Sequence, residues 1–241
     1  MKVWVTRPAR DAAAYAAGLE ALGQTPILQP LFAPDYAGSI GSLYANFDLV
    51  IFTSRNGVRG LAARGLAAQF AATPCLTVGA GTADEARAAG FADVRSGPGE
   101  AHDLLALVDA IAGEARFAIL YARGADVAVD LESPLQDRGH YVESRVVYKM
   151  IETGAPDAAL SDQIAGRGLG AVALFSPRAS ERYVAQITAR GLTAGAAVYV
   201  HDCLSERVAA PLRQLGGLDI AVAAAPNLEE MLALRRRSAA K

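Results

Sequence analysis

Two similar apolar segments of this sequence are each followed by a hydroxyl residue and then an arginine. The first reads Leu-Val-Ile-Phe-Thr-Ser-Arg and ends at Arg55, and the second reads Val-Ala-Leu-Phe-Ser-Pro-Arg and ends at Arg178. Thr53 then corresponds to Ser176, and Arg55 to Arg178, at one offset of 123 positions. An apolar run suits a strand buried on both faces, and a hydroxyl residue after it suits the N-cap of a helix. Because a helix start has unpaired N–H groups and a partial positive charge, both turns have features that suit an anionic group.

Similar turns recur along the chain, and arginines accompany them. Open parallel sheets bind ligands at the carboxyl ends of their strands, so these turns would line one cleft if two domains face each other. A ligand with many carboxylates would suit such a set of helix starts and guanidinium groups. For any single turn, helix capping and a solvated arginine are the simpler explanation, and only the shared position favours a site. The residues predicted to contact the ligand are Arg7, Thr53, Ser54, Arg55, Asn56, Gly79, Thr82, Arg123, Gly124, Ser176, Arg178 and Ser205.

Tyr148 differs from the other aromatic residues in its position. It lies near the end of the predicted strand Tyr141–Met150, beside the same edge. Its phenol can donate or accept a hydrogen bond, whereas Phe32, its counterpart in the repeat described below, cannot. Two interpretations remain open for Tyr148: a group that transfers a proton at the site, or an amphipathic strand-end tyrosine with its hydroxyl in water.

Other polar clusters do not predict a site. Gly79-Ala80-Gly81 lacks the third glycine of a dinucleotide fingerprint, because Asp84 stands in its place. The run His201–Cys203 lies on one turn, where neighbouring side chains rarely converge on one metal ion or form a triad. The arginines Arg235–Arg237 are expected to lie in solvent at a helix end, where positive charge suits the helix dipole. No metal site is predicted.

Short apolar strands alternate with helical segments along the chain. This alternation predicts an α/β fold with parallel sheets and helices on both faces. The predicted strands are Lys2–Thr6, Pro26–Phe32, Asp48–Phe52, Cys75–Gly79, Phe91–Arg95, Phe117–Tyr121, Tyr141–Met150, Ala171–Phe175, Ala197–His201 and Asp219–Ala223. The predicted helices are Ala9–Leu22, Thr82–Ala89, Glu100–Ala112, Asp126–Arg138, Ser180–Arg190, Ser205–Leu215 and Leu228–Arg236.

A second repeat indicates how the chain is divided. Arg7 and Gly23 recur as Arg123 and Gly139 at an offset of 116 positions, and Phe32 recurs as Tyr148. This unit comes first in one half of the chain and second in the other, so the halves are circularly permuted relative to each other. The economical explanation is an inserted domain. The predicted domains are residues 1–35 with 150–241, and residues 36–149 as the insertion.

The composition is that of a globular protein. Of the 241 residues, 52% are hydrophobic and 20% are charged. Lys and Arg number 23 against 25 Asp and Glu, so no overall positive field would attract nucleic acid. No apolar run is long enough to cross a bilayer, and the N-terminus begins a strand rather than a signal peptide. Two cysteines without CxxC spacing predict no disulfide framework. We expect a cytoplasmic protein without nucleic-acid or membrane partners.

Short motifs follow one another in a distinctive order along the chain. They read Val-Trp-Val-Thr-Arg-Pro at 3–8, Ile-Phe-Thr-Ser-Arg-Asn-Gly-Val at 51–58, Val-Gly-Ala-Gly-Thr-Ala at 78–83, Val-Val-Tyr at 146–148 and Phe-Ser-Pro at 175–177. In this order, and with the permuted repeat, they resemble the uroporphyrinogen-III synthase family over nearly the whole chain. The resemblance implies two flavodoxin-like domains joined by a two-stranded linker, and no cofactor. It also implies cyclisation of the linear tetrapyrrole hydroxymethylbilane, with inversion of the last pyrrole ring and loss of water.

The resemblance assigns roles to particular residues. Tyr148 matches the family's candidate acid at the departing hydroxyl group. Where the family often has Gly-Pro-Thr-Thr-Ala, this chain has His201–Glu206, in which only Ser205 offers a replacement hydroxyl. The expected partners are this small-molecule substrate and, transiently, the preceding enzyme of the pathway, with the chain itself a monomer. The matching hydroxyl residues at the turns are Thr53, Ser54, Thr82 and Ser176.

Two other classes of function would share such a fold. A two-domain module for a small anion would bind without turnover. A nucleotide-sugar transferase would show a clearer phosphate loop or metal-binding carboxylates than this sequence does. The synthase reaction needs mainly orientation of the substrate's two ends, which can supply several kcal/mol without a strong acid or base. This agrees with a sequence that has no paired carboxylates and no nucleophile–histidine pattern.

Overall fold

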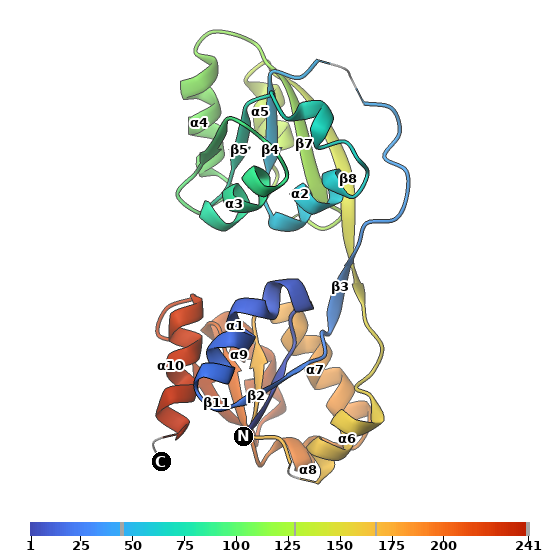
Figure 1. The fold of residues 1–241 in the computed structure, drawn as a ribbon, viewed down its shortest axis with the longest axis vertical. Helices are drawn as coiled ribbons and strands as arrows, with labels where there is room; N and C mark the ends of the chain where they lie inside the picture. The colour runs from blue at the N-terminus through green and yellow to red at the C-terminus, as the bar shows by residue number, and fades with distance from the viewer. Residues whose placement is uncertain (44–45, 128, 167, 240–241) are drawn as a thin grey trace. The chain divides into compact units, whose positions relative to one another are not determined.

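The structure is a computed structural model that describes residues 1–43, 46–127, 129–166 and 168–239. It divides into two compact units (Figure 1). Unit 1 consists of Met1–Ala33 and Ile151–Lys241, and unit 2 consists of Pro34–Met150. Among the described residues, no helix is long and apolar enough to span a membrane.

Unit 1 is built on a five-stranded sheet in the order β11-β10-β9-β1-β2, and each neighbouring pair is parallel. Its central strands are short and largely apolar, as burial on both faces requires. The strands are β1 Lys2–Val5, β2 Thr25–Leu28, β9 Ala171–Leu174, β10 Val200–Cys203 and β11 Asp219–Val222. The helices are α1 Ala9–Ala21, α6 Ala158–Ala165, α7 Pro177–Ala189, α8 Thr193–Ala196, α9 Glu206–Leu215 and α10 Leu228–Ala239.

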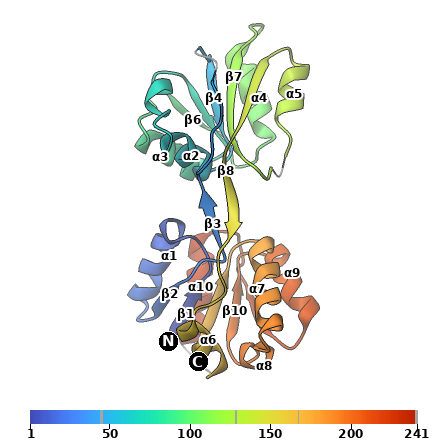
Figure 2. The ribbon, with the colours of Figure 1, turned by 90° about the vertical axis from the view of Figure 1, so that its right-hand side faces the viewer.

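Helices cover both faces of this sheet (Figure 2). On one face, α1 and α10 bury Tyr15 and Met231 against Val3 and Val5 of β1. On the other face α7 packs against α9, and its Tyr183 meets the ring of Trp4 edge-on at 5.6 Å. Alternate residues of β1 therefore serve opposite core layers, as the period of a strand dictates.

Unit 2 is built on a six-stranded sheet in the order β3-β8-β7-β4-β5-β6. The strands from β8 to β6 in this order are parallel. The strands are β3 Phe32–Asp35, β4 Leu49–Phe52, β5 Cys75–Thr77, β6 Val94–Ser96, β7 Ala118–Gly124 and β8 Tyr141–Glu152. The first two residues of β3 and the last two of β8 belong to unit 1. The helices are α2 Arg55–Ala62, the 3₁₀ turn Ala68–Phe70, α3 Ala80–Ala88, α4 Asp103–Ala112 and α5 Glu132–Asp137.

The two faces of this sheet also carry separate cores. Val50 and Phe52 of β4 pack with Val58 of α2 on one face. Ile51 of β4 packs with Val108 of α4 on the other, in the cluster that also holds Leu135, the buried residue of α5. The prediction of a mixed α/β fold with parallel sheets is confirmed.

Several predicted elements have different bounds in the structure. The strands predicted at Phe91–Arg95 and Ala197–His201 lie further along the chain, as β6 Val94–Ser96 and β10 Val200–Cys203. The strand predicted at Pro26–Phe32 is wrong, because β2 ends at Leu28 and Phe32 begins the separate strand β3. Pro30 lies between them and has no N–H group for a sheet. The helix predicted at Asp126–Arg138 is shorter, because Asp130 accepts hydrogen bonds from the first N–H groups of α5 and so fixes its start.

Candidate functional site

Ser54 links the end of β4 to the start of α2. Its backbone is extended, and its Oγ accepts a hydrogen bond from the N–H of Gly57 at 3.1 Å, which makes it the N-cap of α2. The same oxygen lies 3.0 Å from the phenol oxygen of Tyr148 on β8. Tyr148 is half-buried and packs against the core beneath α2. The structure therefore brings a predicted binding residue and the predicted acid into direct contact.

Thr53 reaches a second tyrosine, Tyr121 of β7. The Thr53 Oγ1 and Tyr121 phenol oxygens are 3.4 Å apart. Burial raises the pKa of Tyr121, and the hydrogen bond from Thr53 acts in the opposite direction. Tyr121 belongs to the core beneath α4 and α5, so the two hydroxyls after β4 serve opposite faces of the sheet. Sequence reasoning missed Tyr121, although its position at the end of a predicted strand was the same signal that identified Tyr148.

The polar side chains beside these hydroxyls are held within unit 2. Arg123 donates from Nε to Ser144 Oγ at 2.7 Å and from its guanidinium to the carbonyl of Gly124 at 3.0 Å. Asn56 accepts hydrogen bonds from the phenol of Tyr36 at 2.9 Å and from Arg59 at 3.2 Å. Protein contacts thus fix the orientation of both side chains at this edge.

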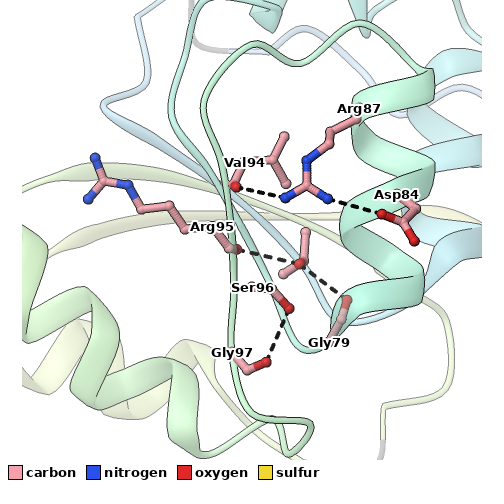
Figure 3. Close-up of polar contacts among 8 residues, drawn as sticks. Gly79, Asp84, Arg87, Val94, Arg95, Ser96 and Gly97 are labelled. Atoms are coloured by element: carbon pink, nitrogen blue, oxygen red, sulfur yellow. Dashed lines mark hydrogen bonds and ion pairs between the residues drawn. The ribbon is translucent and has the colours of Figure 1, made fainter.

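The turn after β5 contributes a glycine to the same edge of the sheet. Gly79 has extended backbone and caps α3 without a side chain. The Thr77 hydroxyl donates a hydrogen bond to the Gly79 carbonyl oxygen at 3.5 Å. Arg87 then ties α3 to β6, since it bonds Asp84 at 3.0 Å and the carbonyl of Val94 at 3.3 Å (Figure 3). These contacts set the position of the predicted residues Gly79 and Thr82 relative to the strand end.

Arg55 lies over this turn. A Cβ atom added to Gly81 would be 3.8 Å from Arg55 Nε. The N–H of Thr82 donates to the Gly79 carbonyl at 3.0 Å, in the first turn of α3. The predicted residues that unit 2 places at this edge are Thr53, Ser54, Arg55, Asn56, Gly79, Thr82, Arg123, Gly124 and Tyr148.

Unit 1 places the other predicted residues at the carboxyl ends of its own strands. The guanidinium carbon of Arg7 lies 4.8 Å from the ring centre of Phe175, and that of Arg178 lies 4.6 Å from the ring centre of Phe32. Contacts of this kind attract a cation to the face of an aromatic ring. Ser205 is the N-cap residue of α9. These residues follow β1, β9 and β10, at one edge of the sheet.

The alignment of Thr53 with Ser176 is wrong by one position. Ser176 caps α7 by accepting from the N–H of Ala179 at 3.2 Å, as Ser54 caps α2. The counterpart of Ser176 is therefore Ser54, and the counterpart of Thr53 is Phe175. The repeated Phe-hydroxyl pattern misled the alignment, because the hydroxyl pair Thr53-Ser54 has only one hydroxyl to match it in unit 1.

The run His201–Cys203 lies in the core of unit 1 and does not form a site at the edge. His201 Nε2 lies 2.8 Å from the phenol oxygen of Tyr183, and burial lowers the pKa of His201 to about 4. Asp202 binds Arg235 of α10 at 2.6 Å, and both side chains are fully buried. The expectation that Arg235 lies in solvent is therefore wrong, because the carboxylate within β10 holds it inside. Among the described residues, no three His, Cys, Asp or Glu side chains are grouped to hold a metal ion.

Parallel sheets with hydroxyl and arginine side chains at their carboxyl edges place the chain among α/β enzymes that act on a small molecule. Comparison with known protein families narrows this class to a single family. The family model described as uroporphyrinogen-III synthase HemD matches residues 13–233. The chain belongs to the uroporphyrinogen-III synthase family, whose members are cyclising lyases. The resemblance seen in the sequence motifs is confirmed.

Solved structures of similar fold support the architecture. A mutant uroporphyrinogen III synthase from the extremely thermophilic bacterium Thermus thermophilus is 22% identical, with a TM-score of 0.56 over 100% of this chain and 99% of that chain. The uroporphyrinogen-III synthetase from Helicobacter pylori 26695 is 17% identical, with a TM-score of 0.63 over 98% of each chain. At these identities the likeness concerns the fold. No curated protein sequence matches the chain.

Proposed function

We propose that this chain converts hydroxymethylbilane to uroporphyrinogen III, with inversion of the last pyrrole ring and loss of water. Family membership supports the reaction, and one contact supports the chemistry: Tyr148 and Ser54 meet at 3.0 Å beside the start of α2. In the proposed step the carbon–oxygen bond of the hydroxymethyl group breaks, and the Tyr148 phenol donates its proton to the departing oxygen, which leaves as water. The freed methylene carbon bonds to the α-carbon of the last pyrrole ring that already carries the methylene bridge. The bond from that α-carbon to the bridge then breaks, and the bridge carbon bonds to the other α-carbon of the inverted ring, whose lost proton restores the phenol.

The substrate's carboxylates would bind the remaining predicted residues at the strand ends. A helix start offers N–H groups and about 0.3–1 kcal/mol of favourable interaction with an anion. The capped starts of α2 and α7, and the glycine start of α3, are of this kind. The arginines beside them would bind carboxylates through paired hydrogen bonds. Orientation of a flexible chain by many such contacts favours closure at the inverted ring.

We also propose that each unit is a flavodoxin-like domain, with unit 2 inserted into unit 1 and circularly permuted relative to it. Numbered along the chain, the strands of unit 1 have the order 2-1-3-4-5, which is the flavodoxin order. The five parallel strands of unit 2 have the order 5-4-1-2-3. This is the same sheet with its first two strands moved to the end. The strand order thus supports the permutation, and β3 and β8 would be the linker strands.

The Tyr148→Phe variant tests the chemical part of this proposal. It removes the donor and keeps the ring against the core beneath α2, so turnover should fall at least about tenfold. The enzymatic product should remain the inverted isomer, because isomer choice depends on how the bound substrate is oriented. Tyr141→Phe is the matched control, since Tyr141 is exposed at the opposite end of β8. Full turnover in Tyr148→Phe would contradict the role of Tyr148 as donor.

A further inference from the structure

The ring of Tyr148 lies against the backbone of Gly124. Gly124 ends β7 and is paired with Tyr148 on β8, at a shift in the register of the two strands. A Cβ atom added to Gly124 would lie 2.7 Å from Cζ of Tyr148 and 2.8 Å from its phenol oxygen. Carbon atoms in contact are about 3.5–4.0 Å apart, so no side chain fits between them. The phenol occupies the space that a larger residue at position 124 would fill.

Two further glycines bring α2 down onto the same strands. A Cβ atom on Gly57 would lie 2.7 Å from the carbonyl oxygen of Ala122 on β7, and one on Gly60 would lie 2.5 Å from that of Val147 on β8. Only a glycine at each position lets the helix backbone approach so closely. Because α2 lies so close to these strands, the Oγ atom of its N-cap residue Ser54 is 3.0 Å from the Tyr148 phenol oxygen. The phenol is thus confined from the side of β7 and from the start of α2.

We propose that Gly124 and Ser54 are positioning residues, which together hold the phenol of Tyr148 in the orientation needed to donate its proton. The proposal rests on the proposed function and adds to it the residues that determine where the donor points. Ser54 Oγ accepts from the N–H of Gly57 and, in this arrangement, gives its own hydroxyl proton to the Tyr148 oxygen. The proton of Tyr148 is then left for the substrate. Gly124 acts by lacking a side chain.

Gly124→Ala tests the proposal, and Gly154→Ala is its matched control. Gly154 is exposed, has no atom within 4 Å of an added Cβ, and does not have a positive φ angle. In Gly124→Ala we expect turnover to fall at least about tenfold, as far as in Tyr148→Phe. In the Tyr148→Phe background the same change should alter turnover by less than about threefold, because two residues that act through one group are not additive. Gly154→Ala should retain the turnover of the unmodified protein.

A spectroscopic readout tests the position of the phenol independently of turnover. With isotope-labelled tyrosine, the Cζ resonance of Tyr148 is identified by its absence in Tyr148→Phe. It should shift in Gly124→Ala and in Ser54→Gly, and not in Gly154→Ala. Ser54→Gly removes the hydroxyl and leaves a residue that is itself well tolerated at an N-cap, so this variant tests the proposal even if Gly124→Ala fails to fold. Ser54→Thr keeps a hydroxyl and should restore the resonance and most of the turnover.

These measurements separate the two proposals. A Tyr148→Phe variant with full turnover contradicts the donor role, and the Cζ resonance then still shows whether Gly124 and Ser54 position the phenol. An unmoved resonance in Gly124→Ala and Ser54→Gly would overturn the positioning role even if Tyr148→Phe is inactive. A further tenfold loss from Gly124→Ala in the Tyr148→Phe background would also overturn it, because position 124 would then act on something other than the phenol.

Discussion

Replacing His201 with glutamine should change how the stability of unit 1 depends on pH. The His201 side chain is fully buried, its Nε2 lies 2.8 Å from the Tyr183 phenol, and its Nδ1 lies 3.0 Å from the Asp219 carbonyl oxygen. Burial lowers the pKa of His201 from 6.5 to about 4, against the raising effect of the Asp219 contact. Below pH 6.5 the unfolded chain therefore binds a proton that the folded chain does not. Stability is lost as pH falls from 6.5 to about 4.

The size of this effect follows from the shift in pKa. One pKa unit corresponds to about 1.4 kcal/mol, so the imidazole should remove about 3 kcal/mol of stability across this range. His201→Gln keeps a neutral polar side chain and cannot titrate there. Urea unfolding at several pH values, followed by the fluorescence of the buried Trp4 beside Tyr183, measures the stability of both proteins. Their difference in stability should change by about 3 kcal/mol between pH 6.5 and pH 4.

The effect of His201 must be taken from the difference in stability between the two proteins, because Asp202 also makes stability depend on pH. Burial raises its pKa to about 7, against the effect of Arg235, so Asp202 alone would lower stability as pH rises. Asp202 faces α10 while His201 faces α7, and its contribution should be common to both proteins. If the pH dependence of His201→Gln matches that of the unmodified protein, His201 is not held neutral by burial and the reasoning fails.

Substitutions also test two further contacts of unit 1. Arg235→Met should lower the free energy of unfolding by about 3–5 kcal/mol, because it leaves Asp202 buried without its ion-pair partner. Adding Asp202→Leu should restore most of that loss in urea unfolding, and an unchanged loss in the double variant would contradict the ion-pair explanation. Ser176→Ala should cost about 1 kcal/mol through loss of the α7 cap, whereas Ser176→Thr should cost less. Equal unfolding midpoints for these two variants would show that the cap contributes nothing.

The fold could be predicted largely because its strands are short, apolar and separated by helices. Buried parallel strands leave this pattern in the sequence, and β4 and β9 show it without interruption. The predictions failed where long-range contacts decide the structure. Arg235 has the sequence context of a solvated helix end, and only the position of Asp202 in the same unit explains its burial. The short helix α6 was not predicted, although Asp157 before it is a recognisable N-cap.

The candidate site was predictable as a set of strand ends but not as a set of contacts. A strand–turn–helix pattern places Thr53 and Ser54 at an edge, yet which tyrosine each one reaches depends on the face toward which its side chain points. The close approach of Gly124 to Tyr148 depends on the strand register, which the sequence does not reveal. Binding by any of the predicted residues remains a prediction.

The central claim, that this chain directs ring closure to the inverted product, is tested most directly by the isomer it forms. Freshly generated hydroxymethylbilane is incubated with and without the protein, and the oxidised porphyrin products are separated by isomer. Without protein, unguided closure gives the uninverted isomer. We predict that the protein shifts the product to the inverted isomer in proportion to its concentration. A product mixture that stays uninverted at every protein concentration would contradict the account.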